Sequence, residues 1–193
     1  MKFAFCLLLL AVVHVAKGES ADPEELAIYR VLFSGTDAVV MEKSEAPAKG
    51  ASVDKPDVQY QIEFSAFLKR QFPSAEDATI KAYVQHPPGA ALLTPKSDVG
   101  AKLVFIDGKT MGEIFKGGKD LNGINAEWAD FKRRYPAGGF TFVSRVSFNP
   151  EKTQALVFIE TSFGSTGMDG YTVFLRKQNG KWIEVGREED VAS

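Results

Sequence analysis

The spacing of hydrophobic residues changes near residue 140. Before it, apolar residues recur every three or four positions in several separate segments, whereas from Phe140 to Val185 they alternate with polar residues or form short apolar runs. The first spacing is typical of amphipathic helices and the second of strands. We therefore expect helices and loops in the first two-thirds of the chain and a sheet in the last third.

Four strands joined by turns are predicted between residues 140 and 185. In the first, over 140–148, Phe140, Phe142, Val146 and Phe148 share one face and Arg145 points to the other. The second, over 154–160, is apolar on both faces, which is typical of a central strand. The third covers 171–175 and the fourth 182–185, and the charged tail over 187–193 is expected to fray.

Two of the connections carry clear turn signals. Asn149-Pro150-Glu151-Lys152 has Asn in the first position of a turn and Pro in the second. Asn179-Gly180 favours a two-residue hairpin of type I′, which requires positive φ at both positions. The Gly-rich stretch over 161–170 shows no periodicity and is interpreted as a loop at the edge of the sheet.

Upstream, helix starts and short apolar runs alternate with turn residues. Asp22-Pro23-Glu24-Glu25 provides a cap, a proline in the first turn and two acids near the helix N-terminus. Further helices are predicted from Asp57, from a capping-box spacing that begins at Ser74, over one or two turns at 111–115, and from Asn125; short strands are predicted at 37–43 and 102–106. Residues 44–56, rich in Ala, Pro, Lys and Gly, are expected to form a mobile surface loop.

These elements predict an α+β domain. Its sheet is expected to be a C-terminal four-stranded antiparallel meander, with 37–43 and 102–106 as possible additional strands and the helices packed on one face. About 175 residues remain after the N-terminal segment discussed next, enough for one core. We therefore interpret residues 19–193 as a single globular domain.

The first 18 residues have the pattern of a secretory signal. Lys2 precedes an apolar run over 3–13, and Ala16-Lys17-Gly18 fits a small-x-small cleavage site, so we expect cleavage after Gly18. The run is shorter than the roughly 20 residues that span a bilayer, so no retained span is expected. The chain is accordingly predicted to be exported, periplasmic or secreted. Cys6 is the only cysteine, so the mature domain has none and depends on its core for stability.

Charge argues against one class of partner. Loss of Lys2 and Lys17 leaves 21 basic against 25 acidic residues, a net charge of −4 with histidine neutral. Nucleic-acid binding depends on clustered Lys and Arg that neutralise phosphates, so it is not expected. The basic runs at 132–134 and 176–177 are interpreted as solvated faces. The oligomeric state is left open.

Motifs for catalysis, metals or phosphate are missing from the sequence. The mature chain has one histidine, His86, in a His-Pro-Pro-Gly stretch that ends a predicted helix, where a cation suits the carbonyl groups. One His without Cys does not make a zinc site, and there is no calcium loop, P-loop or Gly-x-Ser-x-Gly elbow. We predict no cofactor, no metal and no catalytic residue, and lean away from an enzyme without excluding one.

Part of the chain resembles a group of uncharacterised bacterial exported proteins. The shared pattern is W-x-x-F, Y-P, S-R-V-G-F-N, T-Q-A-L-V and a closing G-x-W, and the resemblance runs over about 74–185. The matching residues here are Trp128, Phe131, Tyr135-Pro136, Ser144–Asn149, Thr153–Val157 and Gly180–Trp182. The resemblance implies an exported location and a common fold, and it carries no catalytic residue.

This chain departs from that pattern at two places. Ser147 stands where the group usually has Gly, and the loop that often reads C-G-x-x-C-G is Phe163-Gly164-Ser165-Thr166-Gly167. Any thiol or disulfide role of that loop is therefore absent. If the protein has a specific partner, this loop is the place where we expect it to bind.

Two functions are weighed. The preferred one is a non-catalytic binding protein of the bacterial envelope, whose partner is an envelope protein or another envelope component. The alternative is a binding protein or enzyme for small molecules, resembling the NTF2-like cone, with a pocket between helices and sheet. The polar residues to inspect are Arg145, Ser165, Asp169 and Tyr171, although Arg145 is more simply explained as a sheet residue paired with a neighbouring acid.

Overall fold

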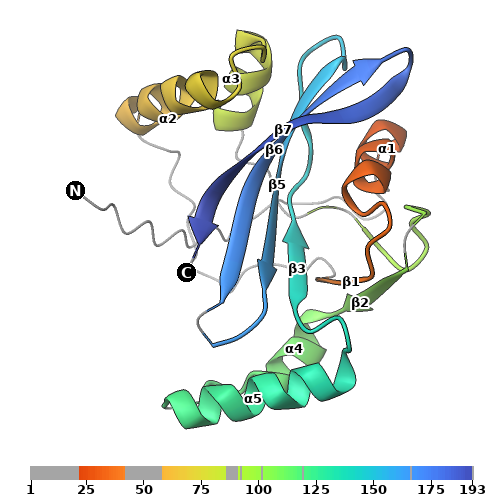
Figure 1. Cartoon of the computed structure of the whole chain (residues 1–193), viewed down its shortest axis with the longest axis vertical. Helices are drawn as coiled ribbons and strands as arrows, with labels where there is room; N and C mark the ends of the chain where they lie inside the picture. Colours follow the sequence, from red (N-terminus) through yellow and green to blue (C-terminus); the bar gives the residue numbers. More distant parts are fainter. Residues whose placement is uncertain are drawn as a thin grey trace.

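The computed structural model describes residues 22–41, 58–85, 91, 93–100, 102–118, 120–165 and 167–192. These residues form helices and one mixed sheet (Figure 1). The helices are α1 (Pro23–Leu32), α2 (Val58–Gln71), α3 (Asp77–Gln85), α4 (Gly108–Ile114) and α5 (Leu121–Arg134). The strands are β1 (Ala38–Met41), β2 (Leu103–Ile106), β3 (Phe140–Val143), β4 (Ser147–Phe148), β5 (Gln154–Ser162), β6 (Met168–Gln178) and β7 (Lys181–Ala192). The predicted loop at 44–56, the signal segment, Asp57 and His86 lie outside the described residues.

The sheet has the order β2-β1-β3-β5-β6-β7, with β4 also paired to β5. β1 runs parallel to both β2 and β3, whereas β3, β5, β6 and β7 are successively antiparallel. The α+β class is confirmed, and the segments at 37–43 and 102–106 do contribute strands. The sheet as a whole is not a four-stranded antiparallel meander, because these two strands add a parallel half. Parallel pairs join segments distant in sequence, which local periodicity does not reveal.

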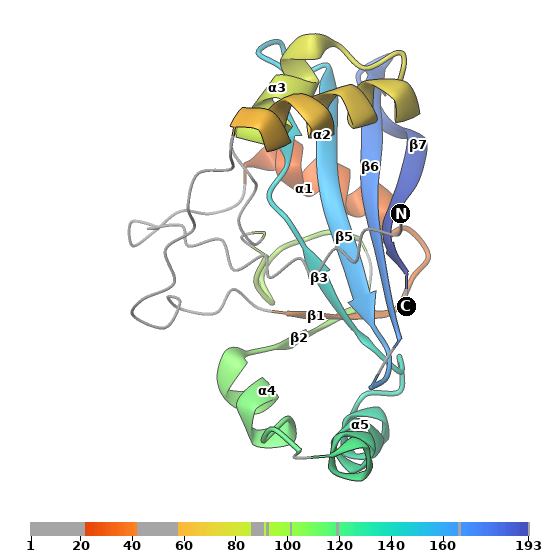
Figure 2. The ribbon, with the colours of Figure 1, turned by 90° about the vertical axis from the view of Figure 1, so that its left-hand side faces the viewer.

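Helices pack on both faces and at one end of the sheet, not on one face as predicted (Figure 2). α1 packs through Ile28 and Tyr29 on a cluster that includes Val157 and Val173. α2 and α3 pack on the opposite face, where Leu156 and Phe174 contribute. Neighbouring residues of one strand point to opposite faces, and here both neighbours are apolar, so β5 and β6 are apolar on both sides. This arrangement confirms the prediction of a central strand over 154–160.

A third cluster closes the end of the sheet below β1, β2 and β3. α4 and α5 contribute Ile114, Trp128 and Phe131, and the strands contribute Val39 and Ile106. The alternation along β1 explains the division, since Val40 belongs to the α1 cluster and Val39 to this one. In both views α5 lies at the opposite end of the molecule from α2 and α3.

The predicted strand over 140–148 is interrupted. Val143 pairs with Ile159 and Ser147 with Leu156, so four steps along this segment match three along β5. The extra residue is a β-bulge, which changes which side chains share a face. Phe142 consequently lies against Phe158, whereas Val146 and Phe148 belong to the α1 cluster. The prediction that all four apolar residues share one face, with Arg145 opposite, was wrong because periodicity does not register a bulge.

The structure confirms three local predictions: the cap of α1, the turn over 149–152 and the Asn179-Gly180 hairpin. Asp22 caps α1 in a full capping box with Glu25, and Lys152 N–H donates to the Asn149 carbonyl at 3.0 Å in the predicted turn. The hairpin between β6 and β7 has φ of 50° at Asn179 and 76° at Gly180, which confirms the type I′ prediction.

Other boundaries were misplaced. α3 begins at Asp77 and not after Ser74, and α5 begins at Leu121 with Asp120, not Asn125, as its cap. β7 continues to Ala192, so the tail expected to fray is an edge strand paired with β6. Among the helices described, none is long and apolar enough to cross a membrane.

Candidate functional site

Arg145 is bound to a buried acid of α1. Its Nε donates to Oε1 of Glu25 at 3.1 Å and its Nη2 to Oε2 at 3.3 Å, and the Val146 N–H also donates to Oε1 at 3.2 Å. The Glu25 side chain is 3% exposed and that of Arg145 33%. The Tyr29 hydroxyl donates to the Ser144 carbonyl at 3.0 Å beside this pair, and burial raises the pKa of Tyr29 well above its ordinary value. Arg145 thus joins α1 to the bulge, as the simpler explanation proposed.

Acidic residues at the N-terminus of α1, the N-cap Asp22 and Glu24, also bind the two hairpins at this end of the sheet. Lys152 donates to Asp22 at 2.5 Å, Lys177 to Glu24 at 2.8 Å, and the Trp182 indole N–H to Glu24 at 2.6 Å. The Lys152 hydrogen bond lowers the pKa of Asp22, and the Lys177 and Trp182 hydrogen bonds lower that of Glu24. A lowered folded-state pKa means that the stabilisation is present above the unfolded value and is lost as pH falls through the folded one.

The remaining predicted site residues lie apart from Arg145. Tyr171, on β6, packs beside the α1 cluster, and the Arg187 guanidinium lies 5.3 Å from its ring centroid. Asp169 is two residues earlier on β6, between Thr161 of β5 and Ala192 of β7. Ser165 lies in the turn between β5 and β6. The structure therefore does not bring the four residues together, and Ser165 lines a groove beside α5.

That groove separates α5 from the β5–β6 turn and has a volume of about 440 Å³. We call it the α5–turn groove. It is open to solvent, and its residues come from one helix and one turn that are distant in sequence: Asn125, Trp128, Ala129 and Lys132 of α5, and Phe163, Gly164, Ser165 and Gly167 of the turn. The loop predicted over 161–170 is shorter in the structure, because β5 extends to Ser162 and β6 begins at Met168. It connects two central strands and does not lie at the edge of the sheet.

Two glycines fix the turn beside α5. The Phe163 N–H donates to the Gly167 carbonyl at 3.0 Å, and a Cβ atom on Gly167 would overlap the Phe163 ring. A Cβ atom on Gly139 would lie 2.5 Å from the Ser162 carbonyl oxygen, so the chain leaving α5 approaches the end of β5 at backbone distance. The Phe163 ring thereby packs directly against Gly167, and 40% of the Phe163 surface remains exposed.

On the α5 side of the groove, Trp128 belongs to a cluster of aromatic residues in contact. Trp128 is 8% exposed, and its ring lies parallel to that of Phe140 with centroids 5.5 Å apart. Phe115 contacts Trp128 edge-on at 5.0 Å, and Phe131 does so at 5.5 Å. Trp128 therefore exposes only its margin to the groove, while the rest of the side chain belongs to the core.

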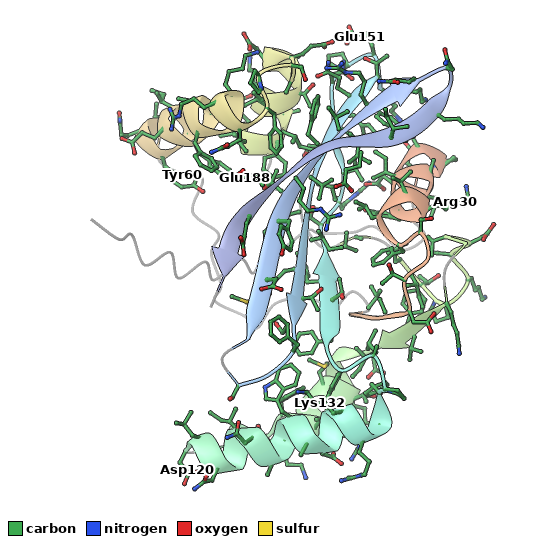
Figure 3. The ribbon with its side chains drawn as sticks, viewed as in Figure 1. Arg30, Tyr60, Asp120, Lys132, Glu151 and Glu188 are labelled. Carbon is green, nitrogen blue, oxygen red and sulfur yellow. The ribbon has the colours of Figure 1, made fainter. Side chains whose placement is uncertain are left out.

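Lys132 gives the groove its positive charge. Arg133 and Arg134, which follow it, both pair with Asp130, the latter at 2.7 Å. Lys132 is exposed on α5 (Figure 3) and forms no ion pair with another residue of the described part. The basic run predicted to be a solvated face is thus divided: the two arginines share one carboxylate within the helix, and Lys132 has no such partner among the described residues.

Sequence reasoning missed Lys132 and Asn125 as groove residues. Asn125 was taken for a helix cap and Lys132 for part of a solvated run. The spacing of Asn125, Ala129 and Lys132, at i, i+4 and i+7, places them on one helical face, but no sequence signal shows that the β5–β6 turn lies opposite that face.

Chemistry beyond binding has little support in this part of the molecule. Among the described residues, no group of three His, Cys, Asp or Glu side chains is placed to hold a metal. Glu160, on β5, has its pKa raised by burial, but it does not line the groove. Comparison of the chain with protein-family models, curated proteins and solved structures found no match. The resemblance to bacterial exported proteins therefore remains a prediction from the sequence.

Proposed function

We propose that this protein is an exported, non-catalytic binding protein of the bacterial envelope, and that it binds a partner through the α5–turn groove. The observation that carries the proposal is Phe163, a half-exposed aromatic ring held by a glycine turn in the same groove as Lys132, a cation without an ion pair among the described residues. Rigid aromatic residues beside a charge are typical anchors of binding surfaces, because they bury large areas at little cost in conformational entropy.

The groove favours an extended segment of a partner protein over a small molecule. It is open along its length, and its polar groups, Asn125, Lys132 and Ser165, lie along both walls. The segment expected there has an apolar side chain that contacts Phe163 and a carboxylate that pairs with Lys132. The NTF2-like alternative requires a pocket between helices and sheet. Where α1 packs on one face of the sheet and α2 and α3 on the other, apolar side chains from helices and strands pack together in clusters, which does not favour such a pocket.

Export is supported by the first 18 residues alone, whose charged, apolar and small-residue regions have the order of a secretory signal. The proposal predicts a mature chain that begins at Glu19 in the envelope fraction. N-terminal sequencing of the protein from fractionated cells tests this directly. An intact Met1 in the cytoplasmic fraction would contradict the location but would leave the groove itself untested, so binding needs its own experiment.

That experiment compares groove variants with matched surface variants. The immobilised mature protein is incubated with envelope extract from the cells that produce it, and bound proteins are identified by mass spectrometry. Phe163→Ser and Lys132→Glu should each abolish recovery of a partner that the unmodified protein retains. Two control variants should retain the partner: Leu121→Ser, which changes an exposed apolar residue of α5 outside the groove lining, and Lys181→Glu, which changes a charge at the distant hairpin. Equal recovery by all four variants would exclude the groove as the binding site.

A further inference from the structure

A second groove lies at the other end of the molecule, between α2 and α3. It has a volume of about 430 Å³ and is lined by two helices. We call it the α2–α3 groove. Its apolar lining residues are Val58, Ile62, Ala66, Ile80 and Val84, and Lys69, Asp77 and Lys81 are among its polar ones.

Two residues of this groove are unusually exposed for their type. Val58 is 70% exposed and Ile62 59%, and they lie one turn apart on the same helix. Single exposed apolar residues are normal on soluble proteins, but adjacent ones that line a groove mark an interaction surface. Val58, Ile62 and Ala66 follow each other at i, i+4 and i+8, so the stripe extends about 12 Å along the helix.

This stripe is not the face that α2 uses for folding. α2 contacts the rest of the domain through Leu68, with Phe64 and Phe67 packed against the same cluster. Val58 and Ile62 belong to no core cluster of the described residues. α2 therefore has two apolar faces, and a helix that is apolar on a face not needed for folding is expected to bury that face against a partner.

The charges at the groove select one kind of partner. Lys69 is occupied, because its Nζ donates to Asp77 at 2.9 Å and to the Ala75 carbonyl at 2.6 Å. Lys81 is exposed on α3 and has no ion pair with any residue of the described part of the chain. Among the described residues, the groove consequently has one positive charge without an ion-pair partner, Lys81, which is complementary to a carboxylate.

We propose that the α2–α3 groove docks an amphipathic helix of a partner protein, with its apolar stripe on Val58 and Ile62 and an acidic side chain at Lys81. Two helices that diverge around an apolar stripe accept a third by the packing of ridges into grooves. The chain's own segment before α2, residues 42–57, does not supply such a stripe, because Val53 is its only branched aliphatic residue. Since the α5–turn groove lies at the opposite end, both surfaces can be occupied at once (Figure 1).

The probe for this proposal is a phage library of random 16-residue peptides selected on the mature protein, with counter-selection on Ile62→Glu. The expected result is a consensus with apolar residues at i, i+3 or i+4, and i+7, and with Asp or Glu beside that stripe. Failure to enrich any peptide that distinguishes the two proteins would overturn the proposal. So would a consensus without helical spacing, or one flanked by basic residues.

A charge reversal then tests the contact with Lys81. By fluorescence anisotropy with the selected peptide, Ile62→Glu should weaken binding at least about tenfold and Lys81→Glu about fivefold. Replacement of the peptide's acid by Lys should restore binding to Lys81→Glu and weaken binding to the unmodified protein. Equal affinities in all four combinations would exclude the ionic contact and with it the proposed partner.

Two control variants locate the effect. Arg70→Glu changes the charge of α2 by the same amount outside the groove and should leave the affinity within about twofold, since a solvent-exposed charge outside the contact is largely screened. Phe163→Ser should have no effect, which separates this surface from the α5–turn groove. Because Ile62 is mostly exposed, its variant should unfold at the temperature of the unmodified protein; a lowered unfolding temperature would mean that Ile62 serves folding and not docking.

Discussion

Replacement of Arg145 by Met tests whether this residue serves the fold or a binding site. The change removes two hydrogen bonds to Glu25 but keeps an apolar chain of similar length. Glu25 would then be a buried carboxylate with the Val146 N–H at 3.2 Å and the Asp22 N–H at 3.4 Å as its remaining donors. The loss of one partner from a fully buried pair costs about 3 to 5 kcal/mol.

The expected cost here is smaller, because one-third of the Arg145 side chain is exposed and water can enter the vacated position. We therefore expect Arg145→Met to lower the free energy of unfolding by about 2 to 3 kcal/mol. Glu25→Gln should cost less, about 1 to 2 kcal/mol, since the guanidinium that remains is in contact with solvent. Arg145→Met should cost more than Glu25→Gln because it leaves the buried charge, that of Glu25, without its partner.

Urea unfolding of the mature protein, monitored by tryptophan fluorescence and extrapolated linearly to water, measures both values. The double variant completes a thermodynamic cycle, in which the coupling of the two residues should account for most of the effect of Arg145→Met. If Arg145→Met is within about 0.5 kcal/mol of the unmodified protein, the range of ordinary surface substitutions, the structural role is wrong. Loss of partner binding together with unchanged stability would make Arg145 a binding residue.

Three further substitutions test the hairpin, the core and a buried acid. Gly180→Val should lower the free energy of unfolding by roughly 1 kcal/mol or more, because φ is 76° there, whereas Gly180→Asn, which tolerates positive φ, should cost less in the same urea assay. Trp128→Ala should cost about 3 to 5 kcal/mol; a near-neutral value with loss of partner binding would make Trp128 a surface anchor. The raised pKa of Glu160 means that its contribution to stability is present below the unfolded value of 4.5 and is lost as pH rises through the folded value. Glu160→Gln should therefore stabilise the protein at pH 7 and no longer do so below pH 4.5. A gain in stability that is independent of pH, measured by urea titrations at several pH values, would contradict this.

The parts of the fold that were predictable depend on local chemistry. The capping box of α1 and the Asn179-Gly180 hairpin are each specified by residues within four positions of one another. The central position of β5 also followed from sequence, because a run that is apolar on both faces must be covered on both. Yet the same observation implied helices on two faces of the sheet, a consequence that the prediction of helices on one face did not draw.

The parts that were not predictable depend on contacts between distant segments. The bulge after Val143 is fixed by pairing with β5, and Glu25 finds Arg145 across 120 residues. The turn containing Ser165 was identified as the place for a partner, but its position opposite Lys132 depends on close backbone approaches such as that of Gly139 to Ser162. Propensity and periodicity contain no information about such approaches.

The central claim is that the α5–turn groove contacts a partner in the envelope, and cross-linking in intact cells tests it most directly. A photoreactive phenylalanine analogue is placed at Phe163 and, as a control of similar exposure, at Val185 on the edge strand. The account predicts a discrete adduct from position 163 that disappears when Lys132→Glu is added, and no such adduct from position 185. Absence of an adduct from position 163, or the same adduct from both positions, would contradict it.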